Sequence, residues 1–104
     1  MPSDNTTRKQ FRAIGHKLNP VVMVKALTEN VGAEIDRALR DHELIKIKVL
    51  AEDREDKKRL IDEICSKQGA ELIQQSGHNA LLFRANPKPN PKLSNLLRYR
   101  ELPN

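Results

Sequence analysis

Few residues in this chain could carry out catalysis or hold a metal ion. The three histidines, His16, His42 and His78, are far apart and fall in three different predicted elements, which argues against an acid–base pair. His16 or His78 beside a lysine could in principle cleave RNA, but no repeated constellation of such residues supports that chemistry. Cys65 is the single cysteine, so no cysteine–histidine spacing suits a metal ion. We therefore expect neither an enzyme nor a bound metal or other cofactor.

The basic residues, in contrast, have a distribution suited to binding a polyanion. The net charge is +5 over 104 residues. Residues 1–25 contain five Lys or Arg and one acidic residue, residues 26–71 contain nine and twelve, and residues 72–104 contain five and one. Lysines scattered for solubility would not separate in this way, so the pattern predicts a basic surface for nucleic acid.

Candidate RNA-contact residues come from three places along the chain. Residues 8–17 have basic side chains without acidic neighbours, and such cations release counterions when they contact phosphates. In residues 25–28 a lysine lies just before a predicted helix start, where backbone amides without hydrogen-bond partners can bind a phosphate. Residues 84–88 lead into a basic tail. The nine candidates are Arg8, Lys9, Arg12, His16, Lys17, Lys25, Thr28, Arg84 and Lys88.

Each of these groups has an alternative interpretation as an ordinary solvated surface. Lys46 and Lys48 should point away from the core, where they could follow an RNA backbone or be covered by Glu43 or Glu52. Only three aromatic residues are present, and two of them occupy core-facing positions, so a stacking platform is not expected. Tyr99 alone could stack on an unpaired base. Binding should therefore depend mainly on phosphates and shape.

Apolar periodicity predicts the elements that position these residues. Apolar residues recur at helical spacing in three segments, and β-branched or alternating runs indicate four strands. Thr28 and Asp53 are good N-cap residues, and Gly69 is placed to end a helix. The expected helices are 7–18, 28–41 and 53–68; the expected strands are 21–24, 44–50, 70–75 and 80–84.

The order α-β-α-β-α-β-β predicts a single α/β domain with a four-stranded mixed sheet packed by three helices. Strand–helix–strand connections should give parallel pairs with right-handed crossovers, and the final hairpin an antiparallel pair. We expect residues 1–6 to be disordered and residues 7–85 to form the RNA-binding domain. Residues 86–104 are rich in proline and lysine, which predicts an extended or disordered basic tail.

Four segments of the chain carry recognisable motifs: 15–22 (GHKLNPVV), 27–31 (LTENV), 41–48 (DHELIKIK) and 69–75 (GAELIQQ). In this order and spacing they resemble the CRM (chloroplast RNA splicing and ribosome maturation) family, in particular its stand-alone bacterial YhbY-type form. The similarity covers about residues 10–95, and the runs HELIK in 41–48 and GAEL in 69–75 are its most specific parts. The resemblance implies a fold similar to the C-terminal domain of a bacterial translation initiation factor. It also implies binding to the ribosomal RNA of large-subunit precursors and a part in ribosome assembly.

The sequence departs from the family at one loop. The resemblance implies a Gly-x-x-Gly phosphate-binding loop after the first strand, yet only Lys25 and Ala26 lie between Val24 and Leu27. Glycines permit positive φ and let backbone amides approach a phosphate. Lys25 could replace part of this interaction by direct charge, a tighter turn could bring the next helix closer, or the loop could have no phosphate-binding role in this chain.

The remaining expectations concern location and partners. No apolar run approaches the length of a membrane span, and the segment Met1–Asn5 lacks the apolar core of a signal peptide. We expect a cytoplasmic protein with RNA as its partner and no membrane or small-molecule substrate. The alternative function is a protein-interaction adaptor that uses its acidic helices, with RNA binding incidental. The oligomeric state and the RNA element bound stay open.

Overall fold

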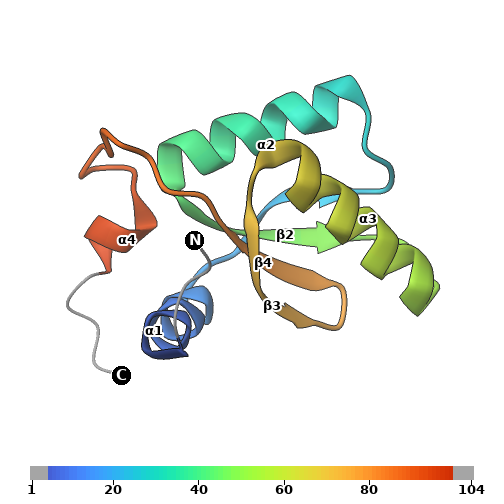
Figure 1. Cartoon of the computed structure of the whole chain (residues 1–104), viewed down its shortest axis with the longest axis horizontal. Helices are drawn as coiled ribbons and strands as arrows, with labels where there is room; N and C mark the ends of the chain where they lie inside the picture. The colour runs from blue at the N-terminus through green and yellow to red at the C-terminus, as the bar shows by residue number, and fades with distance from the viewer. Residues whose placement is uncertain (1–4, 100–104) are drawn as a thin grey trace.

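The computed structural model describes residues 5–99, which form a layered α/β domain (Figure 1). All seven predicted elements are present, and a short fourth helix follows them. The helices are α1 Asn5–Gly15, α2 Glu29–His42, α3 Arg54–Gln68 and α4 Asn95–Arg98. The strands are β1 Pro20–Val24, β2 Leu44–Val49, β3 Glu71–Ser76 and β4 Asn79–Phe83.

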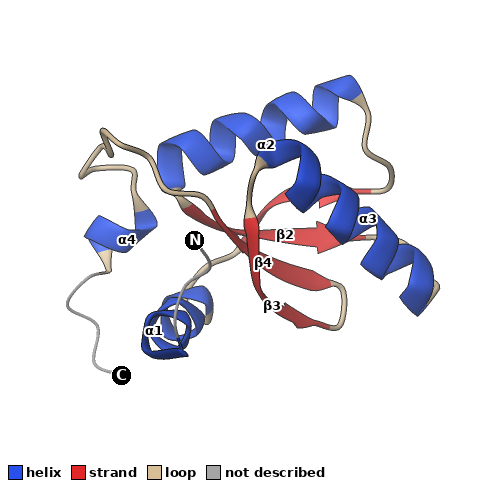
Figure 2. Cartoon of the chain, viewed as in Figure 1, coloured by secondary structure: helices blue, strands red, loops and turns tan. Residues whose placement is uncertain are grey.

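The four strands form one mixed sheet in the order β1-β2-β4-β3 (Figure 2). β1 and β2 are parallel, as expected for two strands joined through a helix, and β3 and β4 form the predicted antiparallel hairpin. The expectation that β2 and β3 would pair directly was wrong. The hairpin instead inserts β4 between them, antiparallel to β2, so β3 becomes an edge strand.

The larger part of the core lies between the sheet and helices α2 and α3. Ile45, Ile47 and Val49 alternate along β2 and are fully buried, because successive side chains of a strand point to opposite faces. Ile35 and Leu39 of α2 pack against them, and Ile61 and Ile64 contribute the buried face of α3. This face of the sheet is therefore apolar along β2, where α2 and α3 cover it.

A smaller apolar cluster lies on the opposite face, beneath α1. Phe11 and Ile14 of α1 pack against Leu44 and Leu81, and the rings of Phe11 and Phe83 have centroids 4.7 Å apart. Gly15 permits this close approach: a Cβ there would lie 2.7 Å from Leu81 Cδ2. The sheet is consequently covered on both faces, but α1 covers only part of its face.

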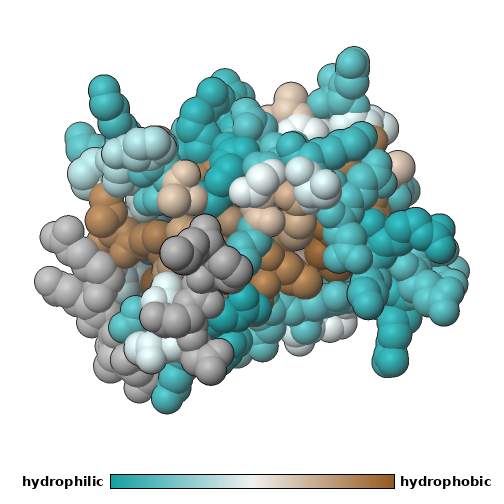
Figure 3. Space-filling view, in the orientation of Figure 1, coloured by the Kyte–Doolittle hydropathy of each residue, from teal (hydrophilic) through white to brown (hydrophobic). Residues whose placement is uncertain are grey.

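The predicted caps of α2 and α3 are confirmed, whereas α1 ends at Gly15 rather than at residue 18 as predicted. Thr28 Oγ1 accepts a hydrogen bond from the Val31 amide at 3.2 Å, and Asp53 Oδ1 accepts one from the Glu55 amide at 3.1 Å. Gly69 ends α3 with φ of 63°, a left-handed conformation that glycine adopts without strain. The first turns of α3 project as a hydrophilic surface at the right of Figure 3.

Two expectations about the ends of the chain need correction. The N-terminal disorder expected through residue 6 is wrong for residues 5 and 6, which begin α1; residues 1–4 lie outside the described residues. The segment expected to be a structureless tail contains α4, and Ser94 and Asn95 are buried. Residues 100–104 of that tail also lie outside the described residues.

Candidate nucleic-acid interface

The candidate interface begins on the solvent side of α1. Phe11 and Ile14 direct one side of the helix to the sheet, so Lys9, Arg12 and His16, spaced at i, i+3 and i+7, share the opposite side. Lys9 and His16 are exposed, and Arg12 is half-buried. Neither Lys9 nor Arg12 forms an ion pair with another of the residues 5–99. Lys9 and Arg12 form a row of available positive charge, and His16 continues the row just beyond the end of α1.

Arg8 belongs to the same helix but has a structural role. Its guanidinium forms an ion pair with Glu71 of β3 and donates to the carbonyls of Leu72 and Ile73 at 3.0 and 3.2 Å. The register between β3 and β4 shifts between Leu72 and Gln74, as at a β-bulge. Arg8 therefore attaches α1 to an edge strand whose carbonyls would otherwise need water.

Beyond the end of α1 the sheet presents an uncovered polar surface. Met23, Lys48, Asn79 and Ser76 are register partners across the four strands, and they lie on the face opposite the large core. Met23 is 65 % exposed and Val21 50 %. The predicted outward orientation of Lys46 and Lys48 is confirmed by their half-buried state on this face.

Two hollows flank the C-terminal end of α1, and Lys46 contributes to both. One, which we call the Asn79 hollow, is lined by Gly15, His16, Lys46, Gln74, Ser76, Asn79 and Leu81. The other, the Tyr99 hollow, is lined by Lys17, Leu18, Asn19, Val21, His42, Ile45, Lys46, Asn95, Arg98 and Tyr99. The two hollows share Lys46, and we call them together the basic groove; His16, Lys17, Lys46 and Arg98 are among its lining residues.

The cations of the basic groove are available for a ligand. Glu43, one of the two acidic residues that could have covered a β2 lysine, is buried and accepts hydrogen bonds from Asn86 and Ser94 instead. Within residues 5–99, Lys17, Lys46 and Lys48 form no ion pair. Clustered cations with an open approach, and with no carboxylate among the lining residues of the described part of the chain, create a positive potential that attracts phosphates.

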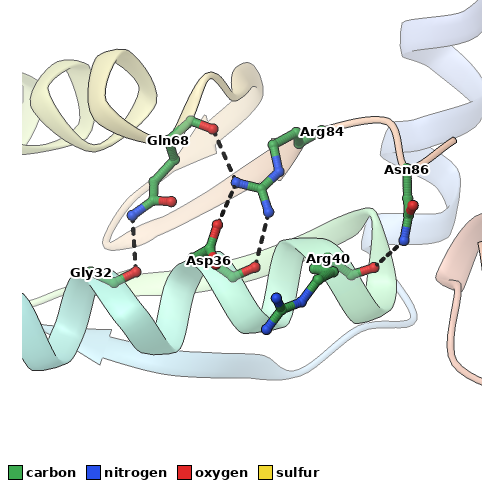
Figure 4. Close-up of polar contacts among 6 residues, drawn as sticks. All are labelled: Gly32, Asp36, Arg40, Gln68, Arg84 and Asn86. Atoms are coloured by element: carbon green, nitrogen blue, oxygen red, sulfur yellow. Dashed lines mark hydrogen bonds and ion pairs between the residues drawn. The ribbon is translucent and has the colours of Figure 1, made fainter.

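Two other predicted contact residues lie away from the groove. Arg84 follows β4 and binds α2 and α3: its guanidinium donates to Asp36 Oδ1 at 3.0 Å, Gln68 O at 3.1 Å and Asp36 O at 3.0 Å (Figure 4). Lys88 is exposed in the segment that Asn86 attaches to Arg40 O at the end of α2. The structure therefore does not bring Arg84 and Lys88 together with the α1 cations.

Comparison with known proteins places this fold in a family. The model of the CRS1/YhbY (CRM) domain matches residues 4–84. The chain belongs to this family.

The relatives of this CRM domain carry consistent names. A protein of Pseudomonas aeruginosa named a probable RNA-binding protein is 50% identical over 94 residues, which cover 88% of this chain and 90% of that protein. An RNA-binding protein of Haemophilus influenzae is 46% identical over 87 residues, covering 81% of this chain and 88% of the other. The solution structure of a hypothetical protein from Staphylococcus aureus has a TM-score of 0.75 at 25% identity, over 89% of this chain and 98% of that one.

The loop after β1 is tight in this CRM domain. Lys25 and Ala26 form a bend, and the Thr28 amide donates to Ala26 O at 3.1 Å. The Thr28 hydroxyl is already used as the cap of α2. Lys25 is exposed one residue beyond Val24, at the end of the sheet where Lys48 and Asn79 lie. A phosphate contact by Lys25 stays a prediction, and the hydroxyl of Thr28 is better explained by capping.

The sequence did not single out several residues of the basic groove. Asn79 falls in a segment whose composition is typical of a turn, but the turn is Gly77-His78 and Asn79 is the first residue of β4. Arg98 falls in the expected disordered tail, whereas α4 brings it to the Tyr99 hollow. The alternation of apolar and polar residues in β2 is the sequence signal that predicts the outward orientation of Lys46 and Lys48. Nothing local in the sequence indicates that these residues converge.

Proposed function

We propose that this CRM domain binds RNA through the basic groove. The observation that carries the proposal is that Lys17, Lys46 and Arg98 converge on one hollow. They come from the end of α1, from β2 and from α4, and none of the lining residues between positions 5 and 99 is acidic. The names of the relatives support RNA as the polyanion. Lys9 and Arg12 extend the positive surface along α1, and Lys48 extends it across the sheet. The protein acts by binding rather than by catalysis.

The bound RNA in this proposal is the ribosomal RNA of large-subunit precursors, in the cytoplasm, where the protein assists assembly. This finer assignment rests on the resemblance of segments such as 41–48 to the stand-alone bacterial members of the family. A groove with three lysine or arginine side chains and one partly exposed tyrosine suits structured RNA, where phosphates supply affinity and one unpaired base can stack.

The test compares neutral substitutions inside and outside the groove. The double variant Lys17→Gln/Lys46→Gln should bind ribosomal RNA fragments more weakly, and the slope of log affinity against log salt should fall by about 0.7–0.9 for each phosphate that the variant no longer neutralises. The matched control is Lys58→Gln, because Lys58 is an exposed α3 lysine without an ion pair in the described residues. Fluorescence anisotropy at several salt concentrations measures both quantities.

Two outcomes would contradict the proposal. One is equal loss of affinity in the groove variant and the Lys58 control, which would indicate a diffuse charge effect. The other is absence of RNA binding by the natural chain in dilute buffer. Sucrose-gradient fractionation of lysate addresses the ribosomal assignment: the natural protein should comigrate with large-subunit precursors at low salt, and Lys17→Gln/Lys46→Gln should move to the free-protein fractions.

A further inference from the structure

The Asn79 hollow contains an unusual group of polar side chains. His16, Lys46, Gln74, Ser76 and Asn79 line it, and none of them forms a side-chain hydrogen bond or ion pair with another of the residues 5–99. Asn79 Oδ1 is a buried acceptor without any partner in that described range. A buried polar atom left without a hydrogen bond costs about 1–3 kcal/mol, so such atoms are rare in folded proteins and call for an explanation.

The location of these side chains makes a purely structural explanation weak. The opposite face of the same strands is apolar, with Ile47, Ala80 and Leu82 fully buried. Asn79 pairs in register with Lys48 on one side and Ser76 on the other, yet its side chain bonds to neither. An apolar residue at position 79 would avoid the unsatisfied acceptor. A bound ligand therefore explains the polar lining better than the packing of the fold does.

The chemistry of the lining restricts the ligand. Asn79 Oδ1 requires an N–H or O–H donor, which a phosphate lacks, whereas the Lys46 ammonium requires an acceptor. Leu81 and Gly15 form an apolar side of the hollow, suited to the face of a flat ring. The hollow has a volume of about 120 Å³, enough for several water molecules or an inserted ring. A ligand with a flat apolar face and an edge of alternating donors and acceptors satisfies all three conditions.

A ligand bound in the Asn79 hollow would lie next to the rest of the basic groove. Lys46 lines both hollows, so a group inserted beside Asn79 lies next to the surface that Lys17 and Arg98 provide for phosphates. We propose that the Asn79 hollow takes one unpaired nucleobase of the bound RNA, and that the buried Asn79 amide turns toward the hollow so that its Oδ1 accepts a hydrogen bond from a base N–H. This inference rests on the proposed function and adds to it a site that reads a base rather than the backbone.

The experiment uses the full chain and two single-stranded probes of about 10 nucleotides, an RNA and its analogue with abasic ribose phosphates, which carry equal charge. The natural protein should bind the RNA more tightly than the abasic analogue. Asn79→Leu should weaken binding of the RNA about fivefold and leave the abasic analogue unchanged, since one net hydrogen bond is removed. Gln75→Leu, the same kind of change on β3 outside the hollow, is the matched control and should leave both affinities unchanged.

A stability measurement separates a binding role from a structural one. Because Asn79→Leu removes an unsatisfied buried acceptor, the midpoint of thermal unfolding should stay the same or rise. A fall in the midpoint together with equal weakening toward both probes would overturn the inference and make Asn79 structural. Equal affinity of the natural protein for both probes would also overturn it, while leaving the proposed function intact. Failure to bind either probe or ribosomal RNA at low salt would instead refute the proposed function.

Discussion

The hydroxyl of Ser94 donates a hydrogen bond of 2.7 Å to Glu43 Oε1, and both residues are buried. Glu43 Oε2 accepts a second hydrogen bond from the amide of Asn86 at 2.9 Å. Ser94 also caps α4, because its Oγ accepts from the Leu97 amide. One carboxylate at the corner between α2 and β2 therefore fixes both ends of the segment 86–94. This interaction makes residues that resemble a flexible tail in composition part of the folded domain.

Removing the Glu43 carboxylate should release this segment. Glu43→Ala leaves the Ser94 hydroxyl without its acceptor in a buried position, and we expect the free energy of unfolding to fall by about 2–4 kcal/mol. Glu43→Gln retains an acceptor of nearly the same shape and should cost less. Urea denaturation measures the change, and limited proteolysis should show faster cleavage after residue 85 in Glu43→Ala. Unchanged stability with unchanged proteolysis would show that the carboxylate does not hold the segment.

Arg8 and Lys9 are neighbours in the sequence but should respond differently to substitution. Arg8→Gln removes the ion pair with Glu71 and the hydrogen bonds to two β3 carbonyls, so unfolding should become easier by about 1–2 kcal/mol. Lys9→Gln changes an exposed residue and should alter stability by less than about 0.5 kcal/mol. It should instead reduce the salt dependence of RNA binding. The opposite pattern would restore Arg8 as an RNA-contact residue.

Arg84 offers a second test of a structural cation. Arg84→Gln removes three hydrogen bonds that join β4 to α2 and α3, and we expect a decrease of about 2 kcal/mol in the free energy of unfolding. RNA affinity measured well below the unfolding temperature should not change, because this side chain lies on the helix-covered side of the sheet. A reduced salt slope with normal stability would return Arg84 to the interface.

The thiol of Cys65 should be unreactive in the folded protein. Burial, with a smaller contribution from the carboxylate of Asp62, raises its pKa from 9.0 to about 11. Because the thiolate is the reactive form, alkylation near pH 8 should be slower in the native protein than in urea. The raised pKa means that the folded state retains the proton, so its contribution to stability is complete below pH 9.0 and declines toward pH 11. Equal rates in native protein and urea would contradict this pKa.

The basic surface shows both the success and the limit of predicting an interface from charge in the sequence. Residues 8–15 do lie in a basic helix, and its cations Lys9 and Arg12 share the side that faces away from Phe11 and Ile14. The sequence alone could not distinguish Arg8 from the other basic residues of this helix, because its acidic partner Glu71 lies 63 positions later in the chain. The same holds for Arg84, since its partner Asp36 is 48 positions away.

By itself, the sequence determined the elements and the two faces of the sheet. The strand period of two and the helix period of 3.6 are local properties, and so are the caps at Thr28, Asp53 and Gly69. The resemblance of its motifs also identified the family. These features depend on neighbours within a few positions, and each can therefore be read along the chain.

Only the tertiary structure decided which polar side chains have partners within the fold and which are available for a ligand. α4 has four residues, too few to be stable in isolation, and it exists because Ser94, Asn95 and the apolar side chains of Leu96 and Tyr99 pack against distant parts of the domain. The same packing brings Arg98 to the hollow that Lys46 also lines. Independently of α4, the fold leaves Asn79 Oδ1 buried without a partner among residues 5–99. Interactions between residues far apart in the sequence leave no periodic pattern, so only the folded chain shows them.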